Sequence, residues 1–183
     1  MTSTNRVLSS FLILSLTAVA GCGGGDGFAT EPGQSILVDS ATSFTIVSSG
    51  GGLVVAPPQG AACDPQLWTY TVHIDTAQFT WDRCQVNNAG TDPAEYVRST
   101  ATRTLSAEQL ESATSAARLV HVSNRNTCGA DKGTLHLSVT SPSGTMVYGD
   151  DFYACLKTDQ AYVESESLDN LNGVLRGLVG PIP

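Results

Sequence analysis

Residues 67–84 read LWTYTVHIDTAQFTWDRC, and this stretch decides the fold class. Apolar and polar side chains alternate on both sides of its middle, which predicts two strands that each bury one face. Two such runs joined by a short turn predict a β-hairpin. A two-residue turn would place Ile74 opposite Phe79, and Val72 would then lie opposite Trp81. The hairpin carries four aromatic side chains, Trp68, Tyr70, Phe79 and Trp81. We expect them to form a core face rather than a binding platform for sugars or peptides.

More strands are predicted on either side of this hairpin. Residues 43–47 (SFTIV) alternate in the same way, and residues 96–104 are rich in Thr and Val, as strands are. We expect residues 96–104 to join the sheet of the first hairpin. A second hairpin is predicted around the turn at 141–144, with Val139 opposite Met146.

Two helices complete the predicted elements. Ser106 and Gln109 have the spacing of a capping box, and the helix that they begin should end near Arg118. The second helix would be capped by Ser167. Its apolar stripe predicts packing against the sheet, and this stripe consists of Leu168, Leu171, Val174, Leu175 and Leu178.

These elements predict one α+β domain over residues 41–180. Its sheet is expected to be antiparallel, built of hairpins, with the two helices packed on one face and two disulfides. Residues 22–40 are rich in Gly with Pro and acids and lack an apolar period at their start, so they predict a flexible tether ahead of the domain.

The N-terminus has the three parts of an export signal. A short polar head carries one cation at Arg6, and the apolar run 7–20 follows it. That run is too short for a comfortable bilayer span, which needs about 20 residues. Residues 1–21 are therefore expected to be a signal peptide that is removed.

Val19-Ala20-Gly21-Cys22 resembles a bacterial lipobox. The resemblance implies that a diacylglycerol is attached to the Cys22 thiol, that the chain is cleaved between Gly21 and Cys22, and that the new N-terminus is acylated. Gly23 follows where an Asp would favour retention in the inner membrane, so the resemblance implies sorting to the outer membrane. The other reading is a secreted protein without an anchor.

Four further cysteines fit an exported chain. An even number in such a chain predicts disulfides, and four cysteines allow three pairings. Cys63 can swing back to Cys84 through a turn at Asp64-Pro65. Extending the ladder of the second hairpin brings Cys155 near Cys128. A zinc site is the rival reading, but no two of these cysteines have the short spacing of a zinc knuckle.

Charge and motif content argue against several classes of function. The formal net charge of −8 and the lack of a basic stripe argue against a nucleic-acid partner. His73, His121 and His136 lack metal-ligand spacing, and Asp150-Asp151 lacks the alternating oxygens of a calcium loop. No nucleophile motif is evident. We therefore expect no cofactor, no metal and no catalytic site.

The layout from Phe44 onward resembles the emfourin family of small bacterial inhibitors of thermolysin-type metallopeptidases. The matching features are Phe44-Thr45-Ile46 leading into Gly50-Gly51-Gly52, the helix entry Leu105–Leu110, the hairpin Leu135–Tyr148 and the Leu-rich C-terminal helix. The chain departs from that family in its lipobox, its cysteines and its long first hairpin. The resemblance implies inhibition but identifies no inhibitory residue.

The sequence predicts a membrane-anchored bacterial lipoprotein with a non-enzymatic binding domain for an unknown partner, which could be an envelope component or a secreted protease. One alternative is a cell-surface inhibitor of a secreted metallopeptidase, which would use an exposed loop such as 56–62 or 87–93. Another is an envelope hydrolase, which would need acids or histidines that converge in a pocket.

Overall fold

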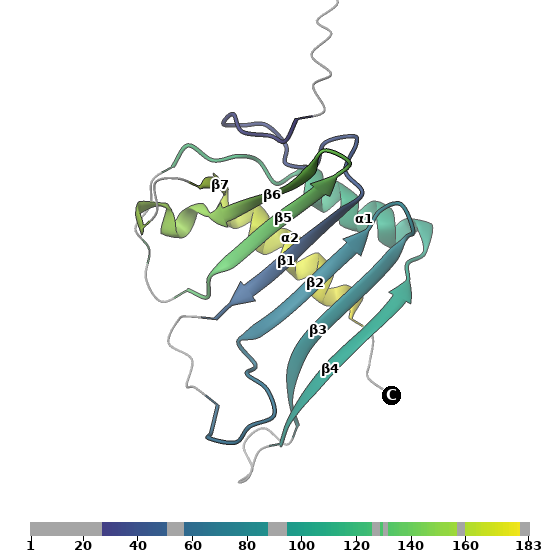
Figure 1. Ribbon diagram of the computed structural model, residues 1–183, viewed down its shortest axis with the longest axis vertical. Coiled ribbons are helices and arrows are strands. Elements are labelled where there is room, and N and C mark those ends of the chain that lie inside the picture. The colour runs from purple at the N-terminus through teal and green to yellow at the C-terminus, as the bar shows by residue number, and fades with distance from the viewer. Residues whose placement is uncertain are drawn as a thin grey trace, which may run out of the picture.

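A computed structural model of the protein describes residues 27–50, 57–87, 95–125, 129, 132–156 and 160–179. It contains one seven-stranded sheet with two α-helices on one face (Figure 1). The predicted α+β class is confirmed. The strands are β1 (Ser43–Ser49), β2 (Leu67–His73), β3 (Gln78–Asn87), β4 (Glu95–Thr104), β5 (Leu135–Ser141), β6 (Gly144–Asp150) and β7 (Ala161–Val163). The helices are α1 (Ala107–Arg118), the short 3-10 helix η1 (Asp151–Leu156) and α2 (Ser165–Leu178).

The strand order is β4-β3-β2-β1-β5-β6-β7, which places β1 in the middle of the sheet. Ile46 of β1 lies opposite Tyr70 of β2 on one side and Leu137 of β5 on the other. β1 therefore joins the two predicted hairpins into one antiparallel sheet. The short β7 pairs with β6 in parallel, so the sheet is mixed, whereas the sequence predicts an antiparallel one.

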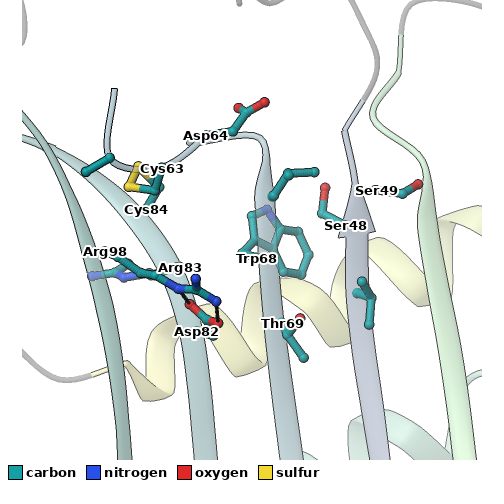
Figure 2. A pocket seen from close by; sticks show the side chains of 13 residues that line it. Ser48, Ser49, Cys63, Asp64, Trp68, Thr69, Asp82, Arg83, Cys84 and Arg98 are labelled. Atoms are coloured by element: carbon teal, nitrogen blue, oxygen red, sulfur yellow. Dashed lines mark hydrogen bonds and ion pairs between the residues drawn. A yellow bond between two sulfur atoms is a disulfide. The ribbon is translucent and has the colours of Figure 1, made fainter. Parts of the chain in front are cut away.

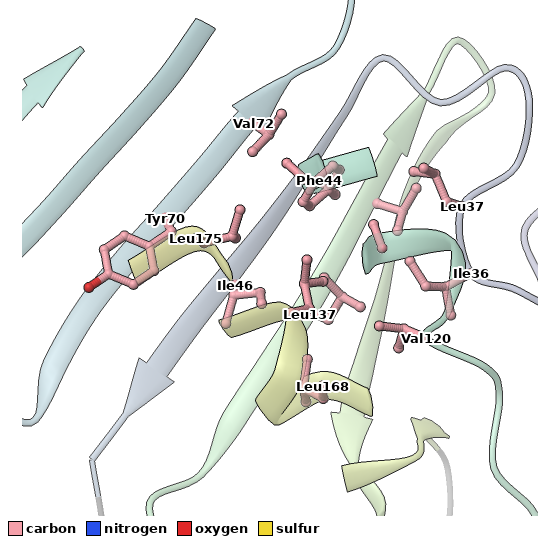
Figure 3. Packing of buried hydrophobic residues seen from close by; sticks show 14 of the residues in the cluster. Ile36, Leu37, Phe44, Ile46, Tyr70, Val72, Val120, Leu137, Leu168 and Leu175 are labelled. Atoms are coloured by element: carbon pink, nitrogen blue, oxygen red, sulfur yellow. The ribbon is translucent and has the colours of Figure 1, made fainter. Parts of the chain in front are cut away.

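The core lies between the sheet and the helices. Phe44 and Ile46 of β1 are completely buried, as are three leucines of α2, Leu168, Leu171 and Leu175. Figure 3 shows Ile46 and Leu137 on the strands that α2 crosses with Leu168 and Leu175. The four aromatic residues of the first hairpin lie on this face as predicted, with Trp68 partly buried at its rim.

The register of the first hairpin differs from the prediction by two residues. Val72 lies opposite Phe79, and Tyr70 lies opposite Trp81. The chain turns through four residues rather than two, and Ala77 takes a positive φ of 51°. A slip of two residues keeps every side chain on its face, so the alternation of the sequence fits both registers.

The second hairpin has the predicted register, with Val139 opposite Met146. Its ladder does not extend toward Cys155, because the chain leaves the sheet after Asp150 and winds into η1. The backbone N–H of Gly129 nevertheless donates to the carbonyl of Phe152 over 2.8 Å, so the two segments lie side by side.

The capping box of α1 is confirmed, with Ser106 and Gln109 each accepting a backbone N–H of the other. The predicted cap of α2 is wrong. This helix begins at Ser165, and the hydroxyl of Ser167 donates back to the Glu164 carbonyl instead of accepting a backbone N–H. Asp151 accepts the Ser165 N–H over 2.9 Å, so a distant carboxylate satisfies this first-turn donor of α2.

The predicted tether 22–40 is too long. Ala29, Ile36 and Leu37 are buried in the core. Ile36 donates its N–H to the Val120 carbonyl, and the Tyr148 hydroxyl donates to the Ala29 carbonyl over 2.9 Å. Burial raises the pKa of Tyr148 to about 12. The domain therefore begins near Ala29, because the apolar side chains of this segment fill the end of the core.

We predict that Ile36→Ala lowers the free energy of unfolding by about 2–5 kcal/mol, because it leaves a cavity in a packed core. Leu119→Ala is the matched control, since Leu119 is 67% exposed and its truncation should change stability by no more than about 0.5 kcal/mol. Urea unfolding followed by circular dichroism measures both. Equal effects of the two substitutions would show that residues before Ala41 are not part of the domain.

Candidate functional site

The face of the sheet that points away from the helices is rich in hydroxyl groups. One row crosses five strands, and its members are Thr102, Thr80, Thr71, Thr45 and Ser138. The Thr45 and Thr71 hydroxyls lie 3.0 Å apart, and those of Thr80 and Thr102 lie 2.9 Å apart. Threonine suits a strand with one solvated face, because its branched Cβ fits the pleat and its hydroxyl can pair across strands. Both described α-helices lie on the other face, so this face is open (Figure 1).

A hollow of about 510 Å³ lies at one end of this open face (Figure 2). Its wall is the segment before β2, which includes Cys63 and Asp64. Its floor contains Val47 and Leu67, and Leu67 is 48% exposed. An apolar floor with charged groups at the rim is typical of small binding sites.

The disulfide Cys63–Cys84 is confirmed and fixes this wall to β3, with 5.5 Å between the two Cα atoms. Further bonds hold the same segment. Asp64 accepts the Gln66 N–H over 2.9 Å, and the Ser48 hydroxyl donates to the Gln66 carbonyl over 2.7 Å. The wall of the hollow is therefore braced from two strands.

Asp82 and Arg98 form an ion pair at the rim of the hollow, and Arg98 donates two hydrogen bonds to the carboxylate. The hydrogen bond from Arg98 lowers the pKa of Asp82, and the same bond raises the pKa of Arg98. Because the Arg98 side chain is exposed and that of Asp82 is partly exposed, the pair adds little stability. Its main effect is to hold a planar guanidinium in a fixed position.

A second concave region follows the flank of α2 on the helix side of the sheet. It consists of a hollow of about 330 Å³ near Lys132 and Asp169 and another of about 220 Å³ near Arg83 and Arg176. Trp68 lines both hollows, as do Pro65 and Asn172. We call this region, over both hollows, the α2 groove.

Lys132 holds the N-terminal end of α2 to the sheet. Its ammonium group donates to Asp150 over 2.8 Å and also contacts Asp169 and Ser165. Burial opposes the charge of Lys132, but the hydrogen bonds to Asp150 and Asp169 outweigh it and raise the pKa. The side chain of Asp150 is completely buried, so it needs this cation.

The pair Asp150-Asp151 thus has structural partners. Asp150 binds Lys132, and Asp151 accepts the Ser123 hydroxyl over 2.6 Å as well as the N–H at the start of α2. His73 and His136 lie on the open face of the sheet, and His121 pairs with Ser35 outside it. The described residues include no group of three or more His, Cys, Asp or Glu side chains that could hold a metal ion.

Three of the predicted site residues, Gly21, Cys22 and Cys128, lie outside the described residues. Cys155 is disulfide-bonded, but its predicted pairing with Cys128 stays a prediction. One complete disulfide is thus described where the sequence predicts two.

The charged side chains around both concave regions were missed by the sequence analysis. Arg83, Arg98 and Arg176 are isolated in the sequence, and strand pairing and helix packing bring them to the hollows. One signal was available: the chain has few cations, and three of them, Arg83, Arg98 and Arg103, fall on predicted strands.

The chain matches no family model, no curated protein and no solved structure. In the part of the chain that the structure describes, no helix is long and apolar enough to span a membrane.

We predict that Lys132→Met lowers the free energy of unfolding by about 3–5 kcal/mol, because it leaves the buried Asp150 carboxylate without its cation. Arg98→Gln is the control, since it breaks an exposed pair and should cost less than about 1 kcal/mol. Because the pKa of Lys132 is raised on folding, its stabilisation is present below about pH 10.4 and is lost as the pH rises through the raised pKa. Urea unfolding at pH 7 tests the ranking, and equal losses would contradict the structural role of Lys132.

Proposed function

We propose that this protein is an exported bacterial lipoprotein, anchored to the outer membrane through Cys22, and that its domain is a non-enzymatic binding module. The observation that carries the proposal is the arrangement of the two ends of the domain. The first described segment, which begins at Gly27, lies at one end of the molecule, and the segment before β2 that walls the hollow lies at the opposite end (Figure 1). A lipid at Cys22 would then leave the hollow facing away from the membrane.

The distance between lipid and domain is short. Ala29, the first buried residue of the core, follows Cys22 by seven residues. Even a fully extended chain would place Ala29 within about 25 Å of the lipid. The domain would therefore be held close to the membrane, with its far end presented to a partner.

The disulfide supports an exported location, because disulfides persist in oxidising compartments. The far end also has the features that a binding site requires. It combines an apolar floor at Val47 and Leu67, a fixed guanidinium at Arg98 and a wall that the Cys63–Cys84 disulfide braces. A rigid site binds with less loss of conformational entropy than a mobile one.

Cys22→Ser tests the anchor. In a bacterial host that processes lipoproteins, the unsubstituted chain should incorporate labelled palmitate and fractionate with the outer membrane, whereas the variant should do neither. The double variant Cys63→Ser/Cys84→Ser is the control, because it removes two other cysteines, which form a disulfide, and should keep the label. Labelling of the Cys22 variant at the unsubstituted level would exclude lipidation at this residue.

A second candidate function is inhibition of a secreted metallopeptidase. The observation that favours it is the exposure of Pro58, Gln59 and Gly60 on the connection that Cys63 ties to β3. An exposed loop on a braced base is the kind of element that can occupy a protease cleft.

Titration of thermolysin-type peptidase activity with the purified protein tests this second candidate. If it is right, the protein should inhibit at near-stoichiometric concentration, and Gln59→Trp should change the inhibition constant at least about tenfold. Thr145→Ala, at the opposite end of the sheet, should leave the constant unchanged. No inhibition at a large molar excess would rule the candidate out.

A further inference from the structure

We propose that the Arg83–Arg176 end of the α2 groove binds the carboxylate of a small organic ligand, whose remaining atoms lie along Trp68. The inference rests on the proposed function, since it names a ligand class that such a binding module would take. It concerns the helix side of the sheet, and this end of the groove adjoins the hollow that the disulfide braces, because Trp68, Arg83 and Cys84 line both.

Two guanidinium groups meet in this hollow from different elements. Arg83 comes from β3 and lies opposite Trp68 of β2, and Arg176 comes from the last turn of α2. Both arginines also affect the pKa of Tyr70. Burial raises this pKa, and the charge and hydrogen bond of Arg83 and the charge of Arg176 offset part of the rise. Helix packing thus places two cations beside one buried phenol.

Among the residues that the structure describes, neither arginine forms an ion pair with a carboxylate. The ion pairs among the described residues use Arg98 and Lys132 instead, and no acidic side chain lines the hollow. The chain carries 17 acids against nine Lys and Arg, so acids for pairing are plentiful elsewhere. Arg176 suits the last turn of a helix, where a cation offsets the helix dipole. That explanation does not apply to Arg83, which lies on a strand.

Two polar atoms at the site are buried without a hydrogen-bond partner, the Nε of Arg83 and the Oδ1 of Asn172. Buried polar atoms of native proteins nearly always have a partner, so these two indicate a place for a ligand or water. An anion would accept a hydrogen bond from Arg83. Asn172 can rotate its amide and donate from the nitrogen.

The surroundings favour a carboxylate on an organic body over a bare inorganic anion. Trp68 stacks on Tyr70 with 4.8 Å between the ring centroids, which provides a flat apolar surface beside the two arginines. The adjoining hollow, which shares Pro65, Trp68 and Asn172, gives such a body room to extend along α2. Guanidinium groups bind a planar carboxylate through two parallel hydrogen bonds, which fixes its orientation.

The test is a titration of the full chain in non-ionic detergent at fixed ionic strength, followed by calorimetry and tryptophan fluorescence. The probes are N-acetylglycine, its neutral amide and inorganic phosphate. We expect saturable binding of N-acetylglycine with a change in Trp68 emission, and at least tenfold weaker binding of the amide and of phosphate. Arg83→Gln and Arg176→Gln should each weaken N-acetylglycine binding at least about tenfold, as expected for loss of a charge-assisted hydrogen bond.

Arg118→Gln is the matched control, because it removes the same charge from an exposed position on α1 and should leave binding unchanged. Thermal unfolding of each variant shows whether it still folds. Arg83→Lys keeps the charge but lacks the planar guanidinium fork, and it replaces any variant that does not fold. The proposal is overturned by equal binding of acid and amide, by binding of phosphate alone, by an equal loss in Arg118→Gln, or by no saturable binding. None of these outcomes depends on Cys22, so palmitate labelling tests the anchor separately.

Discussion

The burial of one sheet face under the leucines of α2 is the interaction on which the rest of the structure depends. β1 forms hydrogen-bonded ladders with β2 and β5, so its side chains Phe44 and Ile46 lie at the centre of the buried face. A sheet with one apolar face needs a cover, and α1 and α2 together provide it. The segment 29–37 closes the end of the core that the helices leave open, which is why the domain starts earlier than its first strand.

Charged groups gather where this cover ends. Lys132 with Asp150 holds the start of α2, and Arg83 lines a hollow together with Arg176 of its last turn. Both sets are at the rim of the core, where a side chain can bury its stem and keep its charged end near water. They differ in pairing, because Lys132 pairs with two carboxylates, whereas no described carboxylate pairs with either arginine. The first set therefore stabilises the fold, and the second is available to a ligand.

The open face and the anchored end follow from the same layout. Because both helices use one side of the sheet, the other side is left to threonines and to the hollow beside the Cys63–Cys84 disulfide. The described chain begins, at Gly27, at the end of the domain away from this hollow (Figure 1). A short connection to a lipid would thus orient the molecule as well as hold it.

The sequence by itself determined the longer strands, the two α-helices and their buried faces, but not the short η1 and β7. Alternation between Trp68 and Trp81, the capping box at Ser106 and the leucine stripe of α2 each depend on neighbours within a few residues, so local periodicity was enough. Only the tertiary structure placed β1 between the two hairpins and set the register of the first, because alternation is the same for every partner and for a register slipped by two. The site belongs to this second group. Arg83 and Arg176 are 93 residues apart in the chain, and packing of α2 on β2 and β3 brings them together.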